Sequence, residues 1–234
     1  MTPIWHPSPN SGPRRDNQRP ELIVLHYTAM QSAEAARDRL CDPTAEVSAH
    51  YLIGADGEVW HLVDEAARAW HAGAGEWHGR ADVNSRSIGI ELDNRGDHPF
   101  AEPQMSVLEE LLRRIMQRWQ IAPTGVIGHS DMAPGRKSDP GPRFDWQRLE
   151  HLGLAAGRGQ DPGPRDATPE KFRAIARDFG YTAPVDDLAL LRTVRLRFRP
   201  WATGPLVAHD FTPLGLSTKW AWPPNPAVSQ KHTS

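Results

Sequence analysis

Apolar residues gather in short continuous runs that are typical of buried strands. The runs ELIVLHYT (21–28) and SIGIEL (87–92) are rich in branched residues and predict strands inside a sheet. In HYLIGADGEVWHLV (50–63) two such runs flank the turn-forming ADG, which predicts a β-hairpin. A further short strand is predicted over GVIGH (125–129), so the runs together predict a mostly buried sheet.

Helical spacing is clearest over EPQMSVLEELLRRIMQRWQ (102–120). Its apolar residues recur three and four positions apart and form one stripe, Pro103 suits the first turn, and Pro123 lies beyond the end. A shorter helix is predicted over SAEAARDRL (32–40), with Ser32 as its N-cap. Strands and helices mixed in this way predict an α/β domain, followed by a small helical tail.

Glycine, proline and charged residues mark the boundaries along the chain. The stretch GLAAGRGQDPGPRDATP (152–168) is dense in all three and predicts a linker. Residues 168–200 hold two short amphipathic helical patterns, and the Pro-rich residues 201–234 predict an irregular tail. The first twenty residues predict an irregular arm, and the main domain extends over residues 1–158.

Composition limits the chemistry that the chain can carry. Its 234 residues suffice for one core of ordinary size and a small appendage. A formal net charge of -2 gives no strong attraction to nucleic acid or to an anionic membrane. Because Cys41 is the single cysteine, an internal disulfide and a CxxC-type zinc knuckle are excluded, and a metal with several protein ligands would be held by histidine and carboxylate.

The sequence also bears on location. No stretch approaches the length of a membrane span, and the N-terminal residues contain no apolar core of a signal peptide. Taken as the natural start, this N-terminus predicts a cytoplasmic protein. A protein whose natural leader is missing from the sequence would look the same, and the periplasm is then the alternative.

Three polar residues fall at the ends of predicted strands. His26 ends the first strand, Glu91 lies near the end of a later one, and His129 ends the last. In an α/β sheet, side chains at the ends of neighbouring strands can meet in one crevice although they are far apart in sequence. A lone histidine there is more often a hydrogen-bonded structural residue than a ligand. Two histidines with a carboxylate match a catalytic zinc site that keeps one position open for water.

The third ligand is expected from the loop GHSDMAPGRKSDPGP (128–142), which offers Asp131 and Asp139. A loop so rich in glycine and proline also fits an ordinary solvated connection. Asp131 lies two residues after His129 and would point away if the strand continued. Asp139 follows a Pro-Gly turn and can fold back, which favours Asp139 as the ligand.

Two further residues fit the hydrolysis of an amide. Glu91 is flanked by apolar residues, and burial there would raise its pKa and suit it to take a proton from water. A strand-end glutamate that points to solvent or pairs with Arg86 is an equal alternative. Lys137, two residues before Asp139, is placed to stabilise a developing oxyanion, although most lysines are simply exposed loop residues.

Five blocks of the sequence together resemble the zinc-dependent N-acetylmuramoyl-L-alanine amidases, whose fold is shared with phage amidase-type lysozymes and peptidoglycan recognition proteins. The blocks follow the order of that family between residues 18 and 150, and as a set they are highly specific. They are LIVLHYTAM (22–30), VSAHYLIGADGEVWHLV (47–63), AWHAG (69–73), NSRSIGIELDN (84–94) and GHSDMAPGRKSDPGP (128–142). The resemblance implies a central mixed β-sheet flanked by helices, with a small helical C-terminal appendage.

The resemblance also implies a role for each candidate residue. It implies that His26, His129 and Asp139 bind zinc. It also implies that Glu91 assists the attacking water and that Lys137 stabilises the oxyanion. The implied substrate is the amide that joins the lactyl group of N-acetylmuramic acid to L-alanine of the stem peptide. Some distant members carry a tyrosine where this chain has Ala49, so that auxiliary role is absent and more depends on Glu91.

Other residues in the matching blocks are candidates for lining a substrate groove. Aromatic and imidazole rings suit stacking on a sugar, and amides suit N-acetyl and peptide groups, although packing is the commoner role for any one of them. These candidates are His50, Trp70, His71, Asn84 and Asn94. Asp131 and Arg136 are candidates for orienting the metal ligands.

Residues 168–200 resemble a shortened form of the helical peptidoglycan-binding module that some of these amidases carry at the C-terminus. A further helix expected after FRP is replaced by a tail rich in proline and tryptophan. Packing of this segment against the main domain is therefore slightly favoured over binding to the cell wall.

The resulting prediction is a cytoplasmic zinc hydrolase that acts on soluble 1,6-anhydro-muropeptides during peptidoglycan turnover and recycling. The alternatives are a periplasmic amidase that trims intact peptidoglycan and a non-catalytic muropeptide sensor. A sensor would have no physical reason to keep the zinc ligands, the base and the oxyanion-stabilising residue together. A serine or cysteine hydrolase is disfavoured because no GxSxG elbow is present. The expected partner is a muropeptide, with neither nucleic acid nor membrane, and the sequence predicts no oligomeric state.

Overall fold

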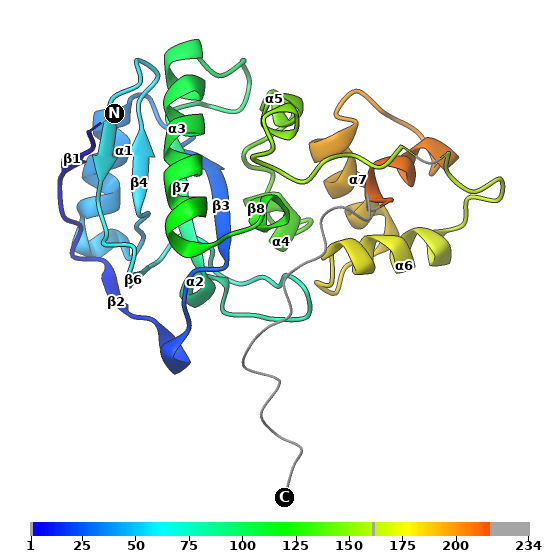
Figure 1. Cartoon of the computed structure of the whole chain (residues 1–234), viewed down its shortest axis with the longest axis horizontal. Coiled ribbons are helices and arrows are strands. Elements are labelled where there is room, and N and C mark those ends of the chain that lie inside the picture. The colour runs from blue at the N-terminus through cyan, green and yellow to red at the C-terminus, as the bar shows by residue number, and fades with distance from the viewer. Residues whose placement is uncertain (1, 161, 216–234) are drawn as a thin grey trace, which may run out of the picture.

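Six strands form one mixed β-sheet in the computed structural model, which describes residues 2–160 and 162–215 (Figure 1). Their order across the sheet is β1-β5-β4-β7-β3-β8, while β2 and β6 form a separate two-stranded sheet. The strands are β1 (Ile4–Trp5), β2 (Ser11–Pro13), β3 (Leu22–Tyr27), β4 (Tyr51–Ile53), β5 (Val59–His61), β6 (Ala67–Ala69), β7 (Ser87–Leu92) and β8 (Val126–Gly128). The α-helices are α1 (Ala33–Cys41), α2 (Val83–Arg86), α3 (Glu102–Trp119), α4 (His129–Met132), α5 (Trp146–His151), α6 (Pro169–Phe179) and α7 (Asp187–Phe198), and the short 3-10 helices are η1 (Arg15–Asn17), η2 (Pro43–Ala45), η3 (Pro123–Gly125), η4 (Ala208–Asp210) and η5 (Thr212–Leu214). A mixed sheet flanked by helices confirms the predicted α/β fold.

The central strands run parallel and end together. β3 pairs with β7 on one side, where His26 lies opposite Glu91, and with β8 on the other, where Leu25 lies opposite Gly128. The carboxyl ends of parallel strands meet at one edge of a sheet, so His129, the first residue after β8, reaches the same edge as His26 and Glu91. The register therefore produces the convergence of strand ends that the sequence predicts.

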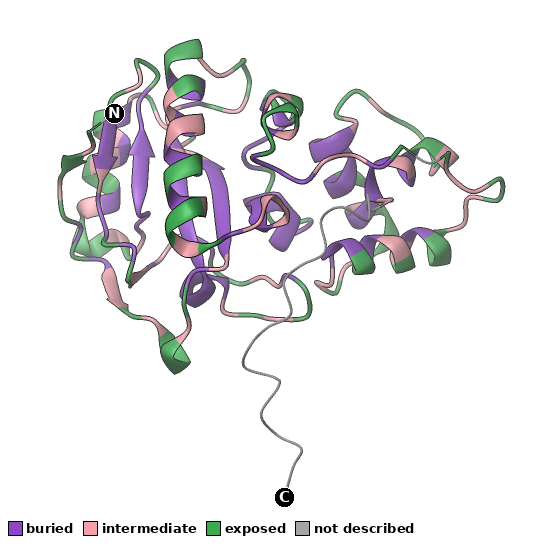
Figure 2. Cartoon of the chain, in the orientation of Figure 1, coloured by how far each residue is buried: buried purple, intermediate pink, exposed green. Residues whose placement is uncertain are grey.

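Alternate residues of β3 face two halves of the core. Ile23 and Leu25 belong to an apolar cluster with α3, whereas Leu22 and Val24 belong to a cluster with α6 and α7. Figure 2 shows the central strands buried and the outward side of α3 exposed. Because side chains alternate along a strand, His26 continues the face of Leu22 and Val24, on the side of the sheet opposite α3.

The predicted helices and hairpin are confirmed. The long stripe over 102–120 forms α3, and the shorter pattern over 32–40 forms α1. Ser32 caps α1, because its Oγ accepts a hydrogen bond from the Ala35 N–H at 3.2 Å. β4 and β5 pair antiparallel across the turn predicted within 50–63.

The predicted irregular arm over the first twenty residues is wrong. In β1, Ile4 lies opposite Trp60 and extends the sheet, and in β2, Ser11 lies opposite Ala69 of β6. Strands of two and three residues are too short to show an alternation of apolar and polar residues. Their formation depends on the partner strands, which a local pattern does not reveal.

The C-terminal helices share a core with the sheet. Phe172 of α6 and Phe198 of α7 lie in the same buried cluster as Val24 of β3 and Ile127 of β8. Figure 1 shows α6 and α7 on the β8 side of the molecule, with α4 and α5 between them and the sheet. The residues predicted as an appendage therefore pack directly against the main domain.

The chain continues after α7 into two short turns. η4 and η5 lie within residues 201–215, and Phe211 and Leu214 there are buried. The rest of the predicted irregular tail, residues 216–234, lies outside the described residues. Within the part of the chain that the structure describes, no helix combines the length and the apolar character needed to cross a membrane.

A buried ion pair joins α7 to the segment after β8. Arg197 Nη1 donates to Asp131 Oδ2 at 2.6 Å, and the Tyr181 hydroxyl donates to Asp131 Oδ1 at 2.7 Å. Both charged residues are buried, and the Arg197 guanidinium lies 4.1 Å from the centre of the Trp146 ring. The C-terminal helices are thereby fastened to α4, the helix that begins with His129.

Replacing Arg197 with methionine is expected to lower the free energy of unfolding by about 3–5 kcal/mol, because the Asp131 charge would remain buried without its cation. Urea unfolding at pH 7 measures the loss. The matched control is Arg114→Met, which removes an exposed ion pair with Glu110 on α3 and is expected to cost no more than about 1 kcal/mol. Equal losses in the two variants would show that the buried pair contributes no more than a surface one.

Candidate metal centre and active site

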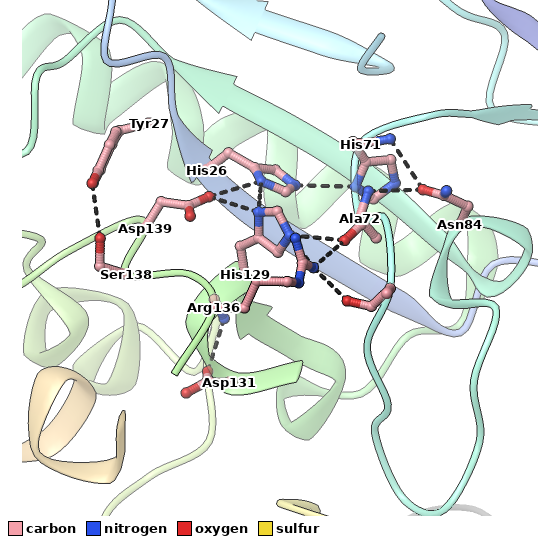
Figure 3. A network of polar contacts seen from close by, with 12 residues as sticks. His26, Tyr27, His71, Ala72, Asn84, His129, Asp131, Arg136, Ser138 and Asp139 are labelled. Carbon is pink, nitrogen blue, oxygen red and sulfur yellow. Dashed lines mark hydrogen bonds and ion pairs between the residues drawn. The ribbon is translucent and has the colours of Figure 1, made fainter. Parts of the chain in front are cut away.

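The three predicted metal ligands meet at the edge of the sheet. The Nδ1 atoms of His26 and His129 lie 2.9 Å apart, and Asp139 Oδ2 lies 2.9 Å from the first and 3.0 Å from the second (Figure 3). His26 comes from the end of β3, His129 from the start of α4, and Asp139 from the loop that follows. All three side chains are buried.

The donor set fits a divalent metal ion. Among the described residues these three form the one group of histidine, cysteine, aspartate or glutamate side chains that could hold a metal. Their ligand atoms are close enough together for one ion to reach all three at about 2.0–2.2 Å, with a position left for water. No group outside the three is needed to complete such a site.

The protonation states of the cluster favour cation binding. Burial, aided by the proximity of His129, lowers the pKa of His26 to about 4, so its imidazole is neutral near pH 7, as a metal ligand must be. Burial alone would raise the pKa of Asp139, but hydrogen bonds from His129 and His26 outweigh burial and hold that pKa well below its usual range. The cluster therefore presents the neutral imidazole of His26 and the carboxylate of Asp139 to a cation.

The loop that carries Asp139 turns back toward the strand end. Gly135 adopts a positive φ of 73°, a conformation that glycine reaches without strain. After this turn, the Ser130 N–H donates to the Asp139 carbonyl at 2.9 Å, which fixes the returning chain beside α4. The structure thus brings Asp139 to His129, the arrangement that the sequence favours.

Asp131, the alternative ligand, is committed elsewhere. One of its oxygens accepts from the Gly128 N–H at 2.8 Å and from Arg197, and the other accepts from Tyr181. The carboxylate therefore faces α6 and α7 and stabilises the first turn of α4, where an acidic residue is favourable. It orients the helix that carries His129 without approaching the cluster.

Glu91 lies in the same pocket as the cluster and is unusual among the carboxylates. Its Oε2 is buried and has no hydrogen-bond partner among the described residues. Burial, reinforced by the negative charge of Asp139 and opposed by Lys137, raises the pKa of Glu91 to about 8. The alternative pairing with Arg86 is wrong, because the Arg86 Nε donates to Glu21 at 2.5 Å.

The pocket over the cluster is large enough for part of a peptide or sugar. Its volume is about 390 Å³, and Lys137 and Arg136 line it on the side of the Asp139 loop. Both cationic residues are exposed, so they can contact a ligand without being pulled out of the fold. Apolar surface is supplied by Met30, Val47 and Trp70. The pocket therefore combines the donor set, the carboxyl of Glu91, cationic side chains and an apolar wall.

The five residues predicted to line the groove divide into two groups. Trp70 and His71 line the pocket. His50, Asn84 and Asn94 are buried side chains that hold the backbone instead. The His50 Nδ1 accepts from Gly89 N–H at 2.9 Å, and the Asn94 Oδ1 accepts from Gly96 N–H at 2.7 Å. This placement does not support the predicted contact of these three residues with substrate.

Three contributors to the site were missed by reasoning from the sequence. They are Ser87 in β7, Tyr181 after α6, and Arg197 in α7. Arg197 alone gave a usable signal, because it falls three residues after Val194 on the apolar side of α7, where an arginine requires a buried partner. Ser87 and Tyr181 carry no local sign of their contacts.

Comparisons with known protein families and with individual proteins agree with one another. Residues 16–142 match the family model described as N-acetylmuramoyl-L-alanine amidase. The N-acetylmuramoyl-L-alanine amidase AmiD of Escherichia coli is 40% identical over 151 residues, which cover 58% of this chain and 54% of AmiD. The 1,6-anhydro-N-acetylmuramyl-L-alanine amidase AmpD of Enterobacter cloacae is 36% identical over 163 residues, which cover 62% of this chain and 87% of AmpD. The matched part thus spans about half of AmiD but most of AmpD.

Solved structures give the same result. AmpDh3 from Pseudomonas aeruginosa superposes with a TM-score of 0.75 at 33% identity and covers 86% of this chain and 91% of that chain. AmiD from E. coli, in complex with anhydro-N-acetylmuramic acid-L-Ala-D-gamma-Glu-L-Lys, superposes with a TM-score of 0.70 at 32% identity and covers 80% of this chain and 83% of that chain. Both superpositions cover a larger share of this chain than residues 16–142 do.

Proposed function

The chain belongs to the N-acetylmuramoyl-L-alanine amidase family, and from this premise we propose that it hydrolyses the amide between N-acetylmuramic acid, in its 1,6-anhydro form, and L-alanine of the stem peptide. One observation carries the proposal. The donor atoms of His26, His129 and Asp139 converge in a single pocket, and the carboxyl of Glu91 lines the same pocket. A role in peptidoglycan turnover and recycling follows from this substrate.

The names of the relatives support the anhydro form of the substrate. AmpD is named as a 1,6-anhydro-N-acetylmuramyl-L-alanine amidase, and AmpDh3 has been solved in complex with an anhydromuramic pentapeptide. The solved AmiD complex also contains an anhydro-N-acetylmuramic acid peptide. A soluble anhydro-muropeptide is therefore the substrate against which this chain should first be assayed.

The proposed metal is zinc, held by His26, His129 and Asp139. Two imidazoles and a carboxylate are a common donor set of catalytic zinc, and the loop supplies no thiolate that would favour a closed structural site. When bound, zinc supplies Lewis acidity at the amide carbonyl and lowers the pKa of water. The residues around the metal transfer the proton of the water and stabilise the negative charge on the carbonyl oxygen.

Glu91 and Lys137 complete the reaction. Glu91 takes a proton from the water whose oxygen attacks the amide carbon, and it returns that proton to the nitrogen of L-alanine as the C–N bond breaks. The products are the lactyl carboxylate on the sugar and a peptide with a free L-alanine amine. Lys137, at the pocket wall, stabilises the negative charge that develops on the carbonyl oxygen.

Replacing Lys137 with alanine is expected to lower kcat by about 10²–10³-fold, the effect of losing one oxyanion donor, with the zinc content unchanged. Steady-state kinetics on a defined anhydro-muropeptide and metal analysis of the same sample measure both. Lys171→Ala is the matched control, because Lys171 is an exposed lysine on α6 outside the pocket. A kcat within twofold of the wild type would remove Lys137 from the mechanism.

Product analysis tests the proposed reaction directly. The purified protein is incubated in parallel with an anhydro-muropeptide and with intact sacculi, and the products are identified by mass spectrometry alongside a zinc assay. The proposal expects a peptide with a free N-terminal L-alanine and anhydro-N-acetylmuramic acid from the first substrate. Cleavage of sacculi alone would favour an amidase that trims intact wall, and binding without products would favour a sensor.

The cellular location stays a prediction. A cytoplasmic amidase would meet anhydro-muropeptides as soluble fragments, and the periplasm is the alternative. Fractionation of cells that express the chain from its natural gene, followed by immunodetection, distinguishes the two compartments.

A further inference from the structure

The outer nitrogens of both imidazole ligands are contacted by two consecutive residues. The His26 Nε2 lies 3.0 Å from the His71 Nδ1, and the His129 Nε2 lies 2.9 Å from the Ala72 carbonyl oxygen (Figure 3). Both contacts come from the AWHAG segment at residues 69–73, which is far from either histidine in the sequence. One short segment thus contacts the Nε2 atoms of both histidines, on the side of each ring that faces away from the cluster.

The hydrogen-bond network assigns a direction to these contacts. When the Nδ1 atoms of His26 and His129 bind a metal ion, neither carries a hydrogen, so the hydrogens of both rings are on Nε2. The His26 Nε2–H then donates to the His71 Nδ1, which must be unprotonated. The proton of His71 is consequently on Nε2, which lies 3.1 Å from the Ser87 Oγ.

The chain of donors ends on the backbone. With its lone pairs facing His71, the Ser87 hydroxyl donates to the Val83 carbonyl at 2.6 Å. From the His26 Nε2 to the Val83 carbonyl, each donor in the chain then faces an acceptor. Reversing any one bond would leave two hydrogens or two lone pairs facing each other, so the network fixes the tautomer of His71.

Two features hold the His71 segment in place. The Asn84 Oδ1 accepts hydrogen bonds from the N–H groups of His71 and Ala72, at 3.0 and 2.8 Å. The ring of His71 lies against Gly89 of β7, where a Cβ would stand only 2.4 Å from the ring Cγ. A glycine at this strand position therefore makes room for the imidazole, which places the ring at a fixed distance from His26.

We propose that His71 is a positioning residue of the metal centre, which orients His26 and fixes its tautomer, and that it is not a substrate contact. Both ring nitrogens of His71 are used, one by His26 and one by Ser87, so neither remains for a sugar or peptide group. Ala72, through its carbonyl, does the same for His129. The proposal rests on the metal part of the proposed function but not on the reaction.

Zinc affinity of the full chain tests the proposal. His71→Leu fills a similar volume without an acceptor and is expected to weaken zinc binding by about 10–100-fold in a chelator competition, the usual cost of losing such an outer partner. His71→Asn keeps an acceptor oxygen near the position of Nδ1 and is expected to stay within about fivefold of the wild type. His151→Leu, at an exposed histidine of α5 that does not line the pocket, is the matched control and is expected to leave zinc affinity unchanged.

A substrate contact predicts the opposite pattern. His71→Leu would then raise KM on the anhydro-muropeptide while zinc affinity stayed at the wild-type value, and this result would overturn the proposal. If His71→Leu weakens zinc binding but the wild type hydrolyses no muropeptide, the proposed function fails and the positioning role stands. The two failures are therefore separate.

The tautomer can also be measured on the unmodified sequence, which removes any dependence on the folding of a variant. Two-bond ¹⁵N–¹H correlation spectra of the zinc-loaded protein are expected to show His71 with hydrogen on Nε2 and none on Nδ1, and His26 with hydrogen on Nε2. A His71 imidazole with hydrogen on Nδ1 would contradict the assigned direction and the proposal with it.

Discussion

Replacing Glu91 with glutamine is expected to lower kcat by about 10²–10⁴-fold, the range for loss of a general base, with no loss of bound metal. Glutamine has the shape of the glutamate and leaves the donors of the cluster in place, but it cannot take a proton from water. Kinetics on an anhydro-muropeptide and metal analysis of the same preparation measure the two quantities. Activity close to the wild type would mean that another group is the base.

Glu91→Gln also has an expected effect on stability that tests its environment separately. The pKa of Glu91 is raised from 4.5 to about 8 in the folded protein, chiefly by burial, so the ionised form is disfavoured by folding. Stability from this group is complete below about pH 4.5 and is lost as the pH rises toward 8. The metal-free variant is therefore expected to have a higher Tm than the metal-free wild type at pH 8, with a smaller difference at pH 5. Equal Tm values at pH 8 would show that the carboxyl is solvated.

Replacing Asp139 with alanine is expected to weaken metal binding by more than about 100-fold, which exceeds the usual cost of losing an outer partner of a ligand. The change removes the only oxygen donor among the three residues of the cluster and leaves two imidazoles. Chelator competition measures the affinity. Turnover should disappear at limiting zinc and return in part when zinc is added in excess.

The control for this prediction is Asp131→Asn. Asp131 lies only eight positions earlier in the same loop, but its oxygens serve Gly128, Tyr181 and Arg197. Asparagine would leave Arg197 without its anion and lower the free energy of unfolding, while the affinity for zinc should change less than in the Asp139 variant. The reverse order of zinc affinities would refute the choice of Asp139 as ligand.

Much of the site could be predicted from the sequence, because strand ends are encoded locally. The apolar runs before His26 and His129 predict strands, and the parallel pairing of β3 with β7 and β8 then carries Glu91 to the same edge. Asp139 could be chosen over Asp131 because a Pro-Gly turn returns the chain. Each of these inferences uses residues within a few positions of the one it concerns.

The rest depends on contacts between segments that no local pattern connects. His71 contacts His26 through one ring nitrogen and Ser87 through the other. Because these three residues come from separate segments of the chain, only the folded structure reveals the contacts of His71. The same is true of β1, whose two residues form a strand only because β5 offers an edge. Residues such as Asn84, which look suited to bind a ligand, are instead occupied by the backbone.

The buried pair between Arg197 and Asp131 has a consequence for anyone who builds hybrid amidases from this chain. From the sequence, the helical segment after residue 168 looks like a separate module that could be exchanged for a peptidoglycan-binding module of another amidase. Since α7 supplies the cation that neutralises Asp131, two residues from His129, a graft cut at the linker would disturb the segment that carries His129 and Asp139. Recombination in this chain has to keep α6 and α7 with the sheet and add any new module beyond them.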